Sequence, residues 1–382
     1  MGYETCEKSG AAPLWQRHRH QFPVTERYIY LHHAGVAPLC RPSAEAMKAL
    51  AEDVLLHGSF HYDKWLAAYD GLRDAAARMI NAEPGEIAIV KNTSEGIATV
   101  ANGLDWRRGD KIVAFDEEFP ANYFPWKRLE SAGINVEWLS CFDPLDKIDK
   151  ACRGARLLAI SFVQFLSGHR VDLKKIGEIC HRHGCIFFVD AIQGLGAFPL
   201  DVRKARIHAL AADGHKWLLG PEGCGVLYVQ KDLQDSIPPS EFGWTNVADF
   251  NDYASRDMTL RRDAGRYECG TLNTIGIFGL RASIDFLLDV GISAISDSVQ
   301  ALGDQIVAGV RAKGYEVLGS RTPESGAGIV SFRKEGIPPA AIVRELKSLG
   351  ILAAPRMGWV RASPHFYISP EEIDRFLEAL PR

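Results

Sequence analysis

Short apolar segments that alternate with amphipathic ones are the feature that most constrains how this chain folds. The apolar segments are rich in Ile, Val and Phe and almost unbroken, as strands buried on both faces of a parallel sheet tend to be. Six of them are expected to be strands, at residues 86–91, 111–115, 134–139, 156–162, 185–190 and 225–229. Helix patterns at 94–104 and 173–184 separate several of these strands. This alternation predicts an α/β fold with a mainly parallel sheet that helices cover on both faces.

The pattern of predicted strands and helices changes near residue 280. Further helices are expected at 43–57, 63–81, 274–289 and 293–313. After them, shorter strand and helix candidates alternate between residues 328 and 380. We therefore expect a large domain of residues 22–280 and a smaller α+β domain of residues 281–382, which also includes the N-terminal segment 1–21.

Composition narrows the class of protein. The net charge of −4 argues against nucleic acid as the main partner. No apolar run approaches the roughly 20 residues that a membrane span needs, and the N-terminus lacks the apolar core of a signal peptide. The eight cysteines contain no CxxC pair, which favours reduced thiols in a cytoplasm. These observations predict a cytoplasmic enzyme or binding protein without a membrane partner.

Chemically active side chains fall where predicted strands end and helices begin. Asp190 ends an otherwise apolar strand, and a buried carboxylate is costly unless a cation or a proton donor pairs with it. Thr93 and Ser94 open a helix, and the free N–H groups of a helix start hold phosphate well. Lys216 follows one more strand-like run at 207–213. An amine, a strand-end acid and such a helix start are what pyridoxal phosphate requires: a Schiff base, a partner for the ring nitrogen and a phosphate site.

Five motifs extend this pattern over nearly the whole chain. They are NTSEG (92–96), VDAIQGLG (189–196), DGHKWLLGPEGCG (213–225), RYECGTLN (266–273) and VRASPHFY (360–367). With them the sequence resembles the class V aminotransferase family of fold-type I pyridoxal-phosphate-dependent enzymes. That family includes cysteine desulfurases, selenocysteine lyases, kynureninase and isopenicillin N epimerase.

The resemblance implies a role for each residue of the cofactor site. Lys216 would carry the cofactor as the internal aldimine and move the proton at the substrate α-carbon. Asp190 would pair with the pyridine nitrogen, Gln193 would hydrogen-bond the phenolic oxygen, and Phe119 would stack on the ring. The phosphate would be held by Thr93, Ser94 and His215.

The resemblance also implies substrate contacts and a partner. Arg361 would bind the α-carboxylate of an amino acid with its planar guanidinium. Gln164 would approach the ring or the substrate. Thr271 would reach the phosphate of the neighbouring subunit, which implies a homodimer with shared active sites.

No metal site is predicted. Residues 180–185 read CHRHGC and place Cys180, His181, His183 and Cys185 close together in sequence. These residues finish a helix and begin a strand, so their side chains are expected to diverge rather than to converge on an ion.

Three departures from the family pattern bear on the reaction. Desulfurases carry a nucleophilic cysteine shortly before the carboxylate-binding arginine, whereas residues 349–363 here contain none. This disfavours desulfuration through an enzyme persulfide. Phe119 replaces the histidine that desulfurases stack on the ring, and aromatic residues there are more typical of the transaminase-like members. Asp213 stands where relatives often have a phosphate-binding serine, and we expect it to turn toward a cap or a cation.

Transamination is the leading prediction from these residues. A lyase that eliminates at the β-carbon of cysteine, cystine or selenocysteine is the alternative, followed by an epimerase. A module that keeps the fold for binding or regulation, without catalysis, is the alternative from another class.

Overall fold

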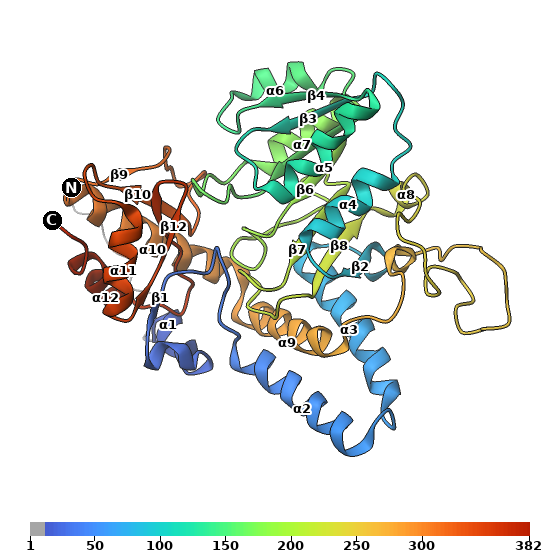
Figure 1. Ribbon diagram of the computed structural model, residues 1–382, viewed down its shortest axis with the longest axis horizontal. Helices are drawn as coiled ribbons and strands as arrows, with labels where there is room; N and C mark the ends of the chain where they lie inside the picture. The colour runs from blue at the N-terminus through green and yellow to red at the C-terminus, as the bar shows by residue number, and fades with distance from the viewer. Residues whose placement is uncertain (1–11) are drawn as a thin grey trace.

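A seven-stranded sheet forms the centre of the larger part of the structure (Figure 1). The computed structural model describes residues 12–382. The strands lie in the order β2-β8-β7-β6-β5-β3-β4, and β8 runs antiparallel to the other six. They are β2 (Ile87–Val90), β3 (Lys111–Phe115), β4 (Asn135–Leu139), β5 (Leu157–Ser161), β6 (Ile186–Asp190), β7 (Ala209–Asp213) and β8 (Gly225–Val229). The predicted strands and the mainly parallel sheet are confirmed.

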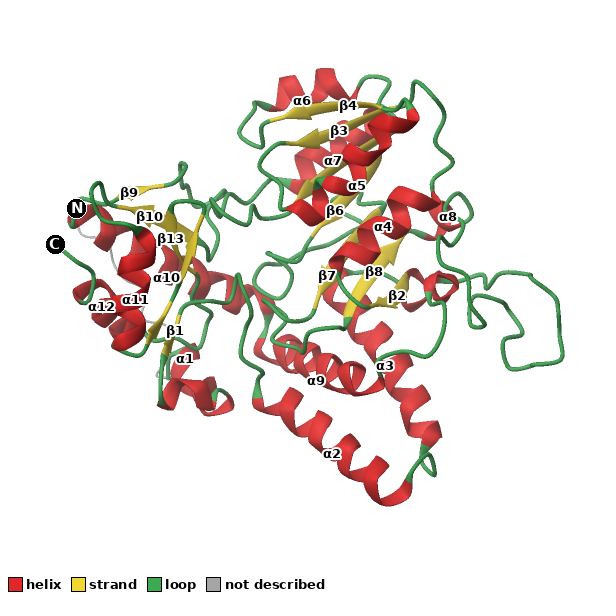
Figure 2. Cartoon of the chain, viewed as in Figure 1, coloured by secondary structure: helices red, strands yellow, loops and turns green. Residues whose placement is uncertain are grey.

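Both faces of this sheet are buried, because the chain supplies apolar residues at successive strand positions. In β2, Ile87 and Ile89 belong to one hydrophobic cluster, while Ala88 and Val90 belong to another. Helices flank the sheet, as Figure 2 shows in red. They are α3 (Tyr62–Ile80), α4 (Thr93–Gly103), α5 (Phe124–Leu129), α6 (Leu145–Cys152), α7 (Leu173–Arg182), α8 (Lys231–Gln234) and α9 (Thr274–Val290). Helix α2 (Arg41–His57) packs on α9 on the side away from the sheet. The predicted two-sided helical cover follows from this double burial.

A smaller antiparallel sheet lies beside the large one, at the left of Figure 1. Its strand order is β12-β13-β10-β9. The strands are β9 (Glu316–Val317), β10 (Val330–Arg333), β12 (Ala354–Arg356) and β13 (Trp359–Ala362), with helices α10 (Ile292–Ala312), α11 (Pro339–Ser348) and α12 (Pro370–Glu378). The predicted smaller α+β unit is therefore present.

The N-terminal segment joins this smaller unit. Strand β1 (Ile29–Tyr30) pairs in parallel with β11 (Ile351–Leu352). The short helix α1 (Leu14–His18) precedes β1. The short 3₁₀ helices are η1 (Arg19–Gln21), η2 (Pro23–Glu26), η3 (Pro84–Glu86), η4 (Pro120–Asn122), η5 (Glu130–Ala132) and η6 (Ala264–Tyr267).

Helix α9 runs through position 280 without a break and packs on α2 and α3. The division into residues 22–280 and 281–382 with 1–21 stays a prediction, and residues 1–11 of it lie outside the described residues. Among residues 12–382, no helix combines the length and the apolar character needed to cross a membrane.

Candidate active site

The candidate site lies at the carboxyl ends of parallel strands, the edge of an open α/β sheet where ligands usually bind. Asp190 is the last residue of β6, and Asp213 is the last residue of β7. Lys216 follows three residues later, and Thr93 begins α4 just after β2. These segments surround a cavity of about 520 Å³. The sheet therefore brings residues from distant parts of the chain to one place.

Eight of the ten predicted site residues line this cavity. They are Thr93, Ser94, Phe119, Asp190, Gln193, His215, Lys216 and Arg361. Gln164 and Thr271 are not among the lining residues. Asn92 and Arg356 also line the cavity, although the sequence analysis did not single them out. The roles that the resemblance gives to these residues remain predictions.

Lys216 is a buried amine without a partner. Its side chain makes no hydrogen bond or ion pair with residues 12–382, and Nζ lies 5.6 Å from the centroid of the Phe119 ring. Burial lowers the pKa of Lys216 from 10.5 to about 8; the charge of Asp190 opposes this shift and that of Arg361 adds to it. An amine that loses its proton near neutral pH is suited to act as a nucleophile or a base.

Asp190 is a buried carboxyl with one oxygen left free. Its Oδ1 accepts a hydrogen bond from the Ile192 N–H at 3.1 Å, and its Oδ2 accepts none from residues 12–382. Burial raises the pKa of Asp190 to about 7, and the neighbouring Glu118 adds to the effect. A cationic ligand group in the cavity, such as a protonated ring nitrogen, would stabilise the ionised form.

Glu118 forms a buried cluster beside Asp190 that the sequence analysis missed. Its carboxyl accepts hydrogen bonds from the Ser161 N–H at 2.7 Å, from the Ser161 hydroxyl and from Gln164 Nε2 at 2.9 Å. Burial raises the pKa of Glu118. Glu118 thus holds Gln164 through its Nε2, while Gln164 Oε1 is buried without a partner. The approach of Gln164 to the ring or the substrate stays a prediction.

The start of α4 offers free donors to the cavity. The Asn92 side chain caps the helix by accepting from the Glu95 N–H at 2.9 Å. The N–H groups of Thr93 and Ser94 have no acceptor within residues 12–382. Two free N–H groups at the positive end of a helix are the arrangement that binds phosphate.

Asp213 supports the turn that carries Lys216. Its Oδ1 accepts from the Gly214 N–H at 2.7 Å, and its own N–H donates to the Thr93 hydroxyl at 3.0 Å. Its Oδ2 lies 3.1 Å from His215 Nδ1 but is not aligned for a hydrogen bond. Asp213 therefore faces a backbone N–H and an imidazole, in keeping with the expected cap or cation.

Gln193 is held at both ends of its amide. Its Nε2 donates to the Ala34 carbonyl at 3.0 Å, and its Oε1 accepts from Trp217 Nε1 at 3.0 Å. The second Nε2 hydrogen is the one left for a ligand oxygen. These two bonds fix the orientation of the amide beside the cavity.

Two arginines reach the cavity from one hairpin of the smaller sheet. Arg361 lies on β13, is buried and donates from Nη1 to the Phe165 carbonyl at 2.7 Å, while its Nε has no partner. Burial and the neighbouring Arg356 on β12 lower the pKa of Arg361 to about 10. Neither guanidinium pairs with a carboxylate of residues 12–382. The pair is therefore available to an anionic ligand.

Thr271 lies away from this cavity in the single chain. It is exposed and borders a separate hollow of about 190 Å³, together with Cys269. None of the cysteines in the described part of the chain lines the larger cavity. Contact between Thr271 and a cofactor phosphate therefore depends on a second subunit and stays a prediction.

The side chains of residues 180–185 are not all arranged as the sequence predicted. The Sγ atoms of Cys180 and Cys185 converge with that of Cys152, and all three lie within 4.8 Å of one another. The predicted divergence is thus wrong for these two cysteines. The turn after α7 reverses the chain, and a Cys185 N–H to Cys180 carbonyl bond of 2.9 Å holds the two residues together. His181 and His183 are not part of this thiol cluster of Cys152, Cys180 and Cys185.

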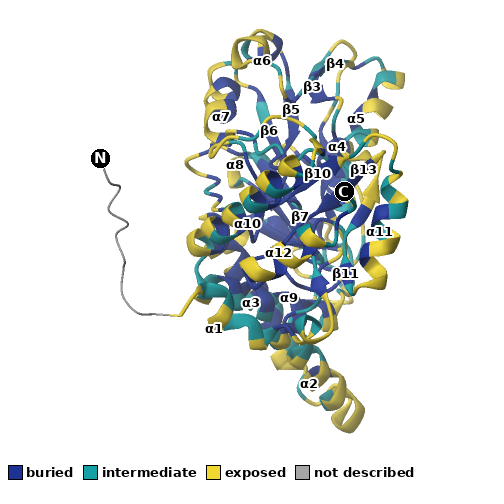
Figure 3. Cartoon of the chain, turned by 90° about the vertical axis from the view of Figure 1, so that its left-hand side faces the viewer, coloured by how far each residue is buried: buried dark blue, intermediate teal, exposed yellow. Residues whose placement is uncertain are grey.

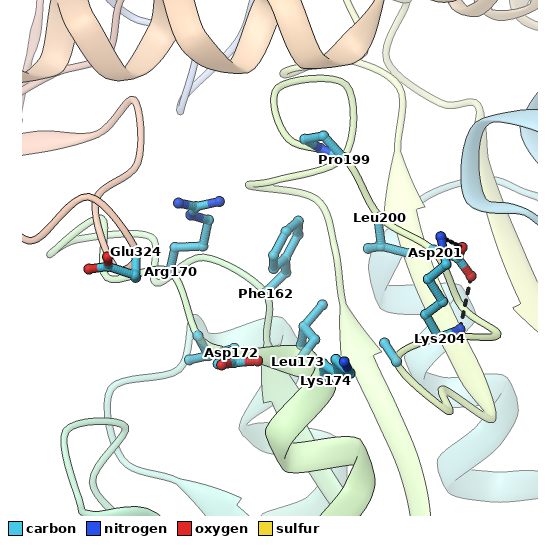
Figure 4. A pocket seen from close by; sticks show the side chains of 12 residues that line it. Phe162, Arg170, Asp172, Leu173, Lys174, Pro199, Leu200, Asp201, Lys204 and Glu324 are labelled. Atoms are coloured by element: carbon cyan, nitrogen blue, oxygen red, sulfur yellow. Dashed lines mark hydrogen bonds and ion pairs between the residues drawn. The ribbon is translucent and has the colours of Figure 1, made fainter.

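A second cavity, of about 290 Å³, lies near Phe162 and Leu200 (Figure 4). Its partly buried charged groups are already engaged. Asp201 pairs with Lys204 at 3.3 Å, and Arg170 donates to the carbonyls of Gly326 and Pro323. Lys174 and Glu324 also line it but are exposed, so this cavity lacks the buried, partnerless groups that mark the Lys216 site.

The unpaired groups of the larger cavity fit one cofactor. A partnerless buried amine, a buried carboxyl with a free oxygen and a helix start with free N–H groups match the aldehyde, ring nitrogen and phosphate of pyridoxal phosphate. An α/β fold with this set at the sheet edge defines a pyridoxal-phosphate-dependent enzyme.

The chain belongs to the class V aminotransferase family, whose family model matches residues 29–376. A probable cysteine desulfurase from Pyrococcus abyssi is 33% identical over 95% of this chain and 96% of its own length. The apo structure of a cysteine desulfurase from Thermococcus onnurineus NA1 superposes with a TM-score of 0.89 at 28% identity, covering 97% of this chain and 98% of that one. The cystine C–S lyase C-DES, in complex with its product cysteine persulfide, gives a TM-score of 0.88 at 25% identity over 94% and 98% of the two chains. The cofactor is pyridoxal phosphate.

Proposed function

We propose that this protein is a C–S lyase that eliminates sulfur from the β-carbon of a cysteine- or cystine-like amino acid and releases the sulfur product into solution. The names of its relatives, cysteine desulfurase and cystine C–S lyase, favour C–S cleavage over the transamination that the sequence put first. One observation supports the release into solution. Among residues 12–382, the lining of the cavity includes an amine and two arginines but no cysteine to take up sulfur.

Different residues of the cavity would carry out different steps of such an elimination. Arg361 binds the α-carboxylate, and the Lys216 amine, which loses its proton near pH 8, takes the proton from the α-carbon. Pyridoxal phosphate, when bound, supplies the electron sink that makes this C–H bond acidic. The C–S bond then breaks with the electron pair leaving on sulfur, and the remaining three-carbon unit is hydrolysed to pyruvate and ammonia.

Arg356 favours a substrate with a second anionic group. Cystine has two carboxylates, and the hairpin offers two guanidinium groups that no protein carboxylate among residues 12–382 neutralises. When cystine is cleaved on one side of its disulfide, the leaving group is cysteine persulfide. A protein thiol is not needed for that reaction.

The cysteines of the chain support this route. The seven cysteines within residues 12–382 are unpaired, and six of them are buried. Cys269 is partly exposed but lies in the separate hollow beside Thr271. Free thiols also support the cytoplasmic location that we propose, because thiols stay reduced there.

The test is product analysis with the holoenzyme and with a Cys6→Ser/Cys269→Ser double variant, which removes Cys269 and the one cysteine outside residues 12–382. We expect pyruvate and ammonia in equal amounts from L-cystine, with the same rate in both proteins. A double variant that loses most of this activity would show that an enzyme thiol takes part and would overturn the proposed release.

Transamination is the second candidate, and the aromatic ring of Phe119 beneath the Lys216 amine favours it. It predicts that an amino acid bleaches the visible band of the cofactor in one turnover, without ammonia. A keto acid would then restore the band.

We also propose that the protein is a homodimer. Large apolar side chains are exposed at the end of α2 and just beyond it, at Leu55, Leu56 and Phe60, with 82%, 66% and 81% exposure. Figure 3 shows this end of α2 projecting from the body. Exposed apolar patches of this kind mark interaction surfaces. We expect light scattering to give a dimer mass, and Leu55→Lys to shift it toward the monomer; a wild-type monomer would contradict the proposal.

A further inference from the structure

The thiol cluster of Cys152, Cys180 and Cys185 has no part in the proposed reaction. Cys152 ends α6, Cys180 lies on α7, and Cys185 directly precedes β6. Their exposed fractions are 0%, 0% and 1%. Three separate backbone segments thus direct three sulfur atoms toward one point in the interior.

The spacing of the sulfur atoms suits a bound metal ion. All three Sγ atoms lie within 4.8 Å of one another. Zinc–sulfur bonds of about 2.3 Å in tetrahedral geometry place the sulfur atoms about 3.8 Å apart, so small side-chain rotations bring the thiols to bonding distance. Thiolates select soft ions such as zinc, and a closed site without access to solvent is typical of a structural ion.

We propose that Cys152, Cys180 and Cys185 bind one zinc ion as thiolates. Binding releases three protons to solvent and leaves a net charge of −1 on the ion and its three ligands. Zinc is favoured over a singly charged copper ion, because copper with three thiolates would leave a net charge of −2 in the interior. The positive charge of Lys111 acts on Cys152 and partly offsets the negative charge of the zinc site.

His183 is the candidate for the fourth ligand. Its Nε2 lies 3.1 Å from Asp149 Oδ1, which matches the carboxylate–histidine arrangement that orients metal-bound imidazoles. Its Nδ1 makes no hydrogen bond with residues 12–382. His183 does not lie within 4.8 Å of all three sulfur atoms, so its side chain would have to rotate for Nδ1 to bind the ion.

The ion would tie α6 and α7 to the beginning of β6. The other end of β6 carries Asp190, which lines the active-site cavity. The site thus has a structural role, since a metal that binds the folded chain alone stabilises it.

The experiment is a zinc titration of the reduced holoenzyme, after removal of metal, in competition with a chromophoric chelator. We expect one tightly bound equivalent per chain in the wild type. Cys152→Ala is expected to weaken zinc binding at least 100-fold, and His183→Gln about 10-fold. Cys40→Ala is the matched control, because Cys40 is also a fully buried, unpaired cysteine but lies before α2, and it should bind zinc like the wild type.

Cobalt provides a readout that does not depend on whether a variant folds. Cobalt added to the wild type should give the intense thiolate-to-metal charge-transfer band in the near ultraviolet. The proposal is overturned if the wild type binds no equivalent, if Cys152→Ala binds zinc as tightly as the wild type, or if the cobalt band is absent. A mass two hydrogens lower in the unreduced protein, together with no zinc binding, would identify a disulfide in place of the metal site.

Discussion

Replacing Lys216 by methionine is predicted to stabilise the cofactor-free protein in a pH-dependent way. The pKa of Lys216 falls from 10.5 in the unfolded chain to about 8 in the folded one, mainly because burial disfavours the charged amine. Each pKa unit corresponds to about 1.4 kcal/mol, so keeping the proton on the buried amine costs about 3 kcal/mol. This cost applies in full below pH 8 and disappears as the pH rises from 8 to 10.5, where both states lose the proton. The Lys216→Met variant should therefore be about 3 kcal/mol more stable at pH 7 and gain nothing above pH 10.5.

Urea unfolding of the two apoproteins at pH 7 and at pH 10.5 measures this difference. Lys48→Met is the matched control, since Lys48 is an exposed lysine on α2 whose replacement should change stability little at either pH. Any stability that the methionine side chain adds by packing is independent of pH. The stability difference between variant and wild type at pH 7, minus the same difference at pH 10.5, therefore measures the charge effect alone. Equal stabilities at pH 7, or a gain that persists unchanged at pH 10.5, would refute the reasoning.

Two further changes test the active site and the stability of the fold. Arg361→Lys should lower kcat/KM about 100-fold, because a point charge replaces the planar guanidinium, whereas the exposed Arg344→Lys should have no effect; equal steady-state kinetics for both would contradict the carboxylate role. Glu268→Gln should lower the free energy of unfolding by about 3 kcal/mol, since this buried carboxylate accepts from Arg73 Nη2 at 2.5 Å and from the Ile89 N–H at 2.9 Å. An unchanged urea midpoint would show that the ion pair adds no stability.

Residues whose function depends on local sequence were the ones that could be predicted. Asp190 and Lys216 stand next to apolar runs, so the strands themselves place them at the sheet edge. Thr93 and Ser94 follow a strand and begin a helix, and the direction of that helix points their N–H groups at the cavity. The antiparallel direction of β8 was missed, because an apolar run of five residues carries no sign of its orientation.

Residues whose position depends on tertiary contacts escaped prediction. Glu118 is buried because Ser161 and Gln164, more than 40 residues away, turn their donors toward it. Arg356 reaches the cavity only because β12 pairs with β13, and β12, with three residues, is too short to be recognised by periodicity. Cys152 joins the thiol cluster through the packing of α6 on α7, which no pattern within residues 180–185 could indicate.

The hairpin of β12 and β13 also bears on how this active site can acquire new chemistry. Arg356 pairs with Trp359, so Met357 and Gly358 form a two-residue turn, with φ of 45° and 83°. Hairpin tips tolerate extra residues, since each doubling of loop length costs only about 0.6 kcal/mol. An insertion at this tip would extend over the cavity while the paired strands keep both arginines in place. An insertion at this turn, by evolution or design, can thus place a thiol, an acid or a lid near the Lys216 amine without disturbing the core.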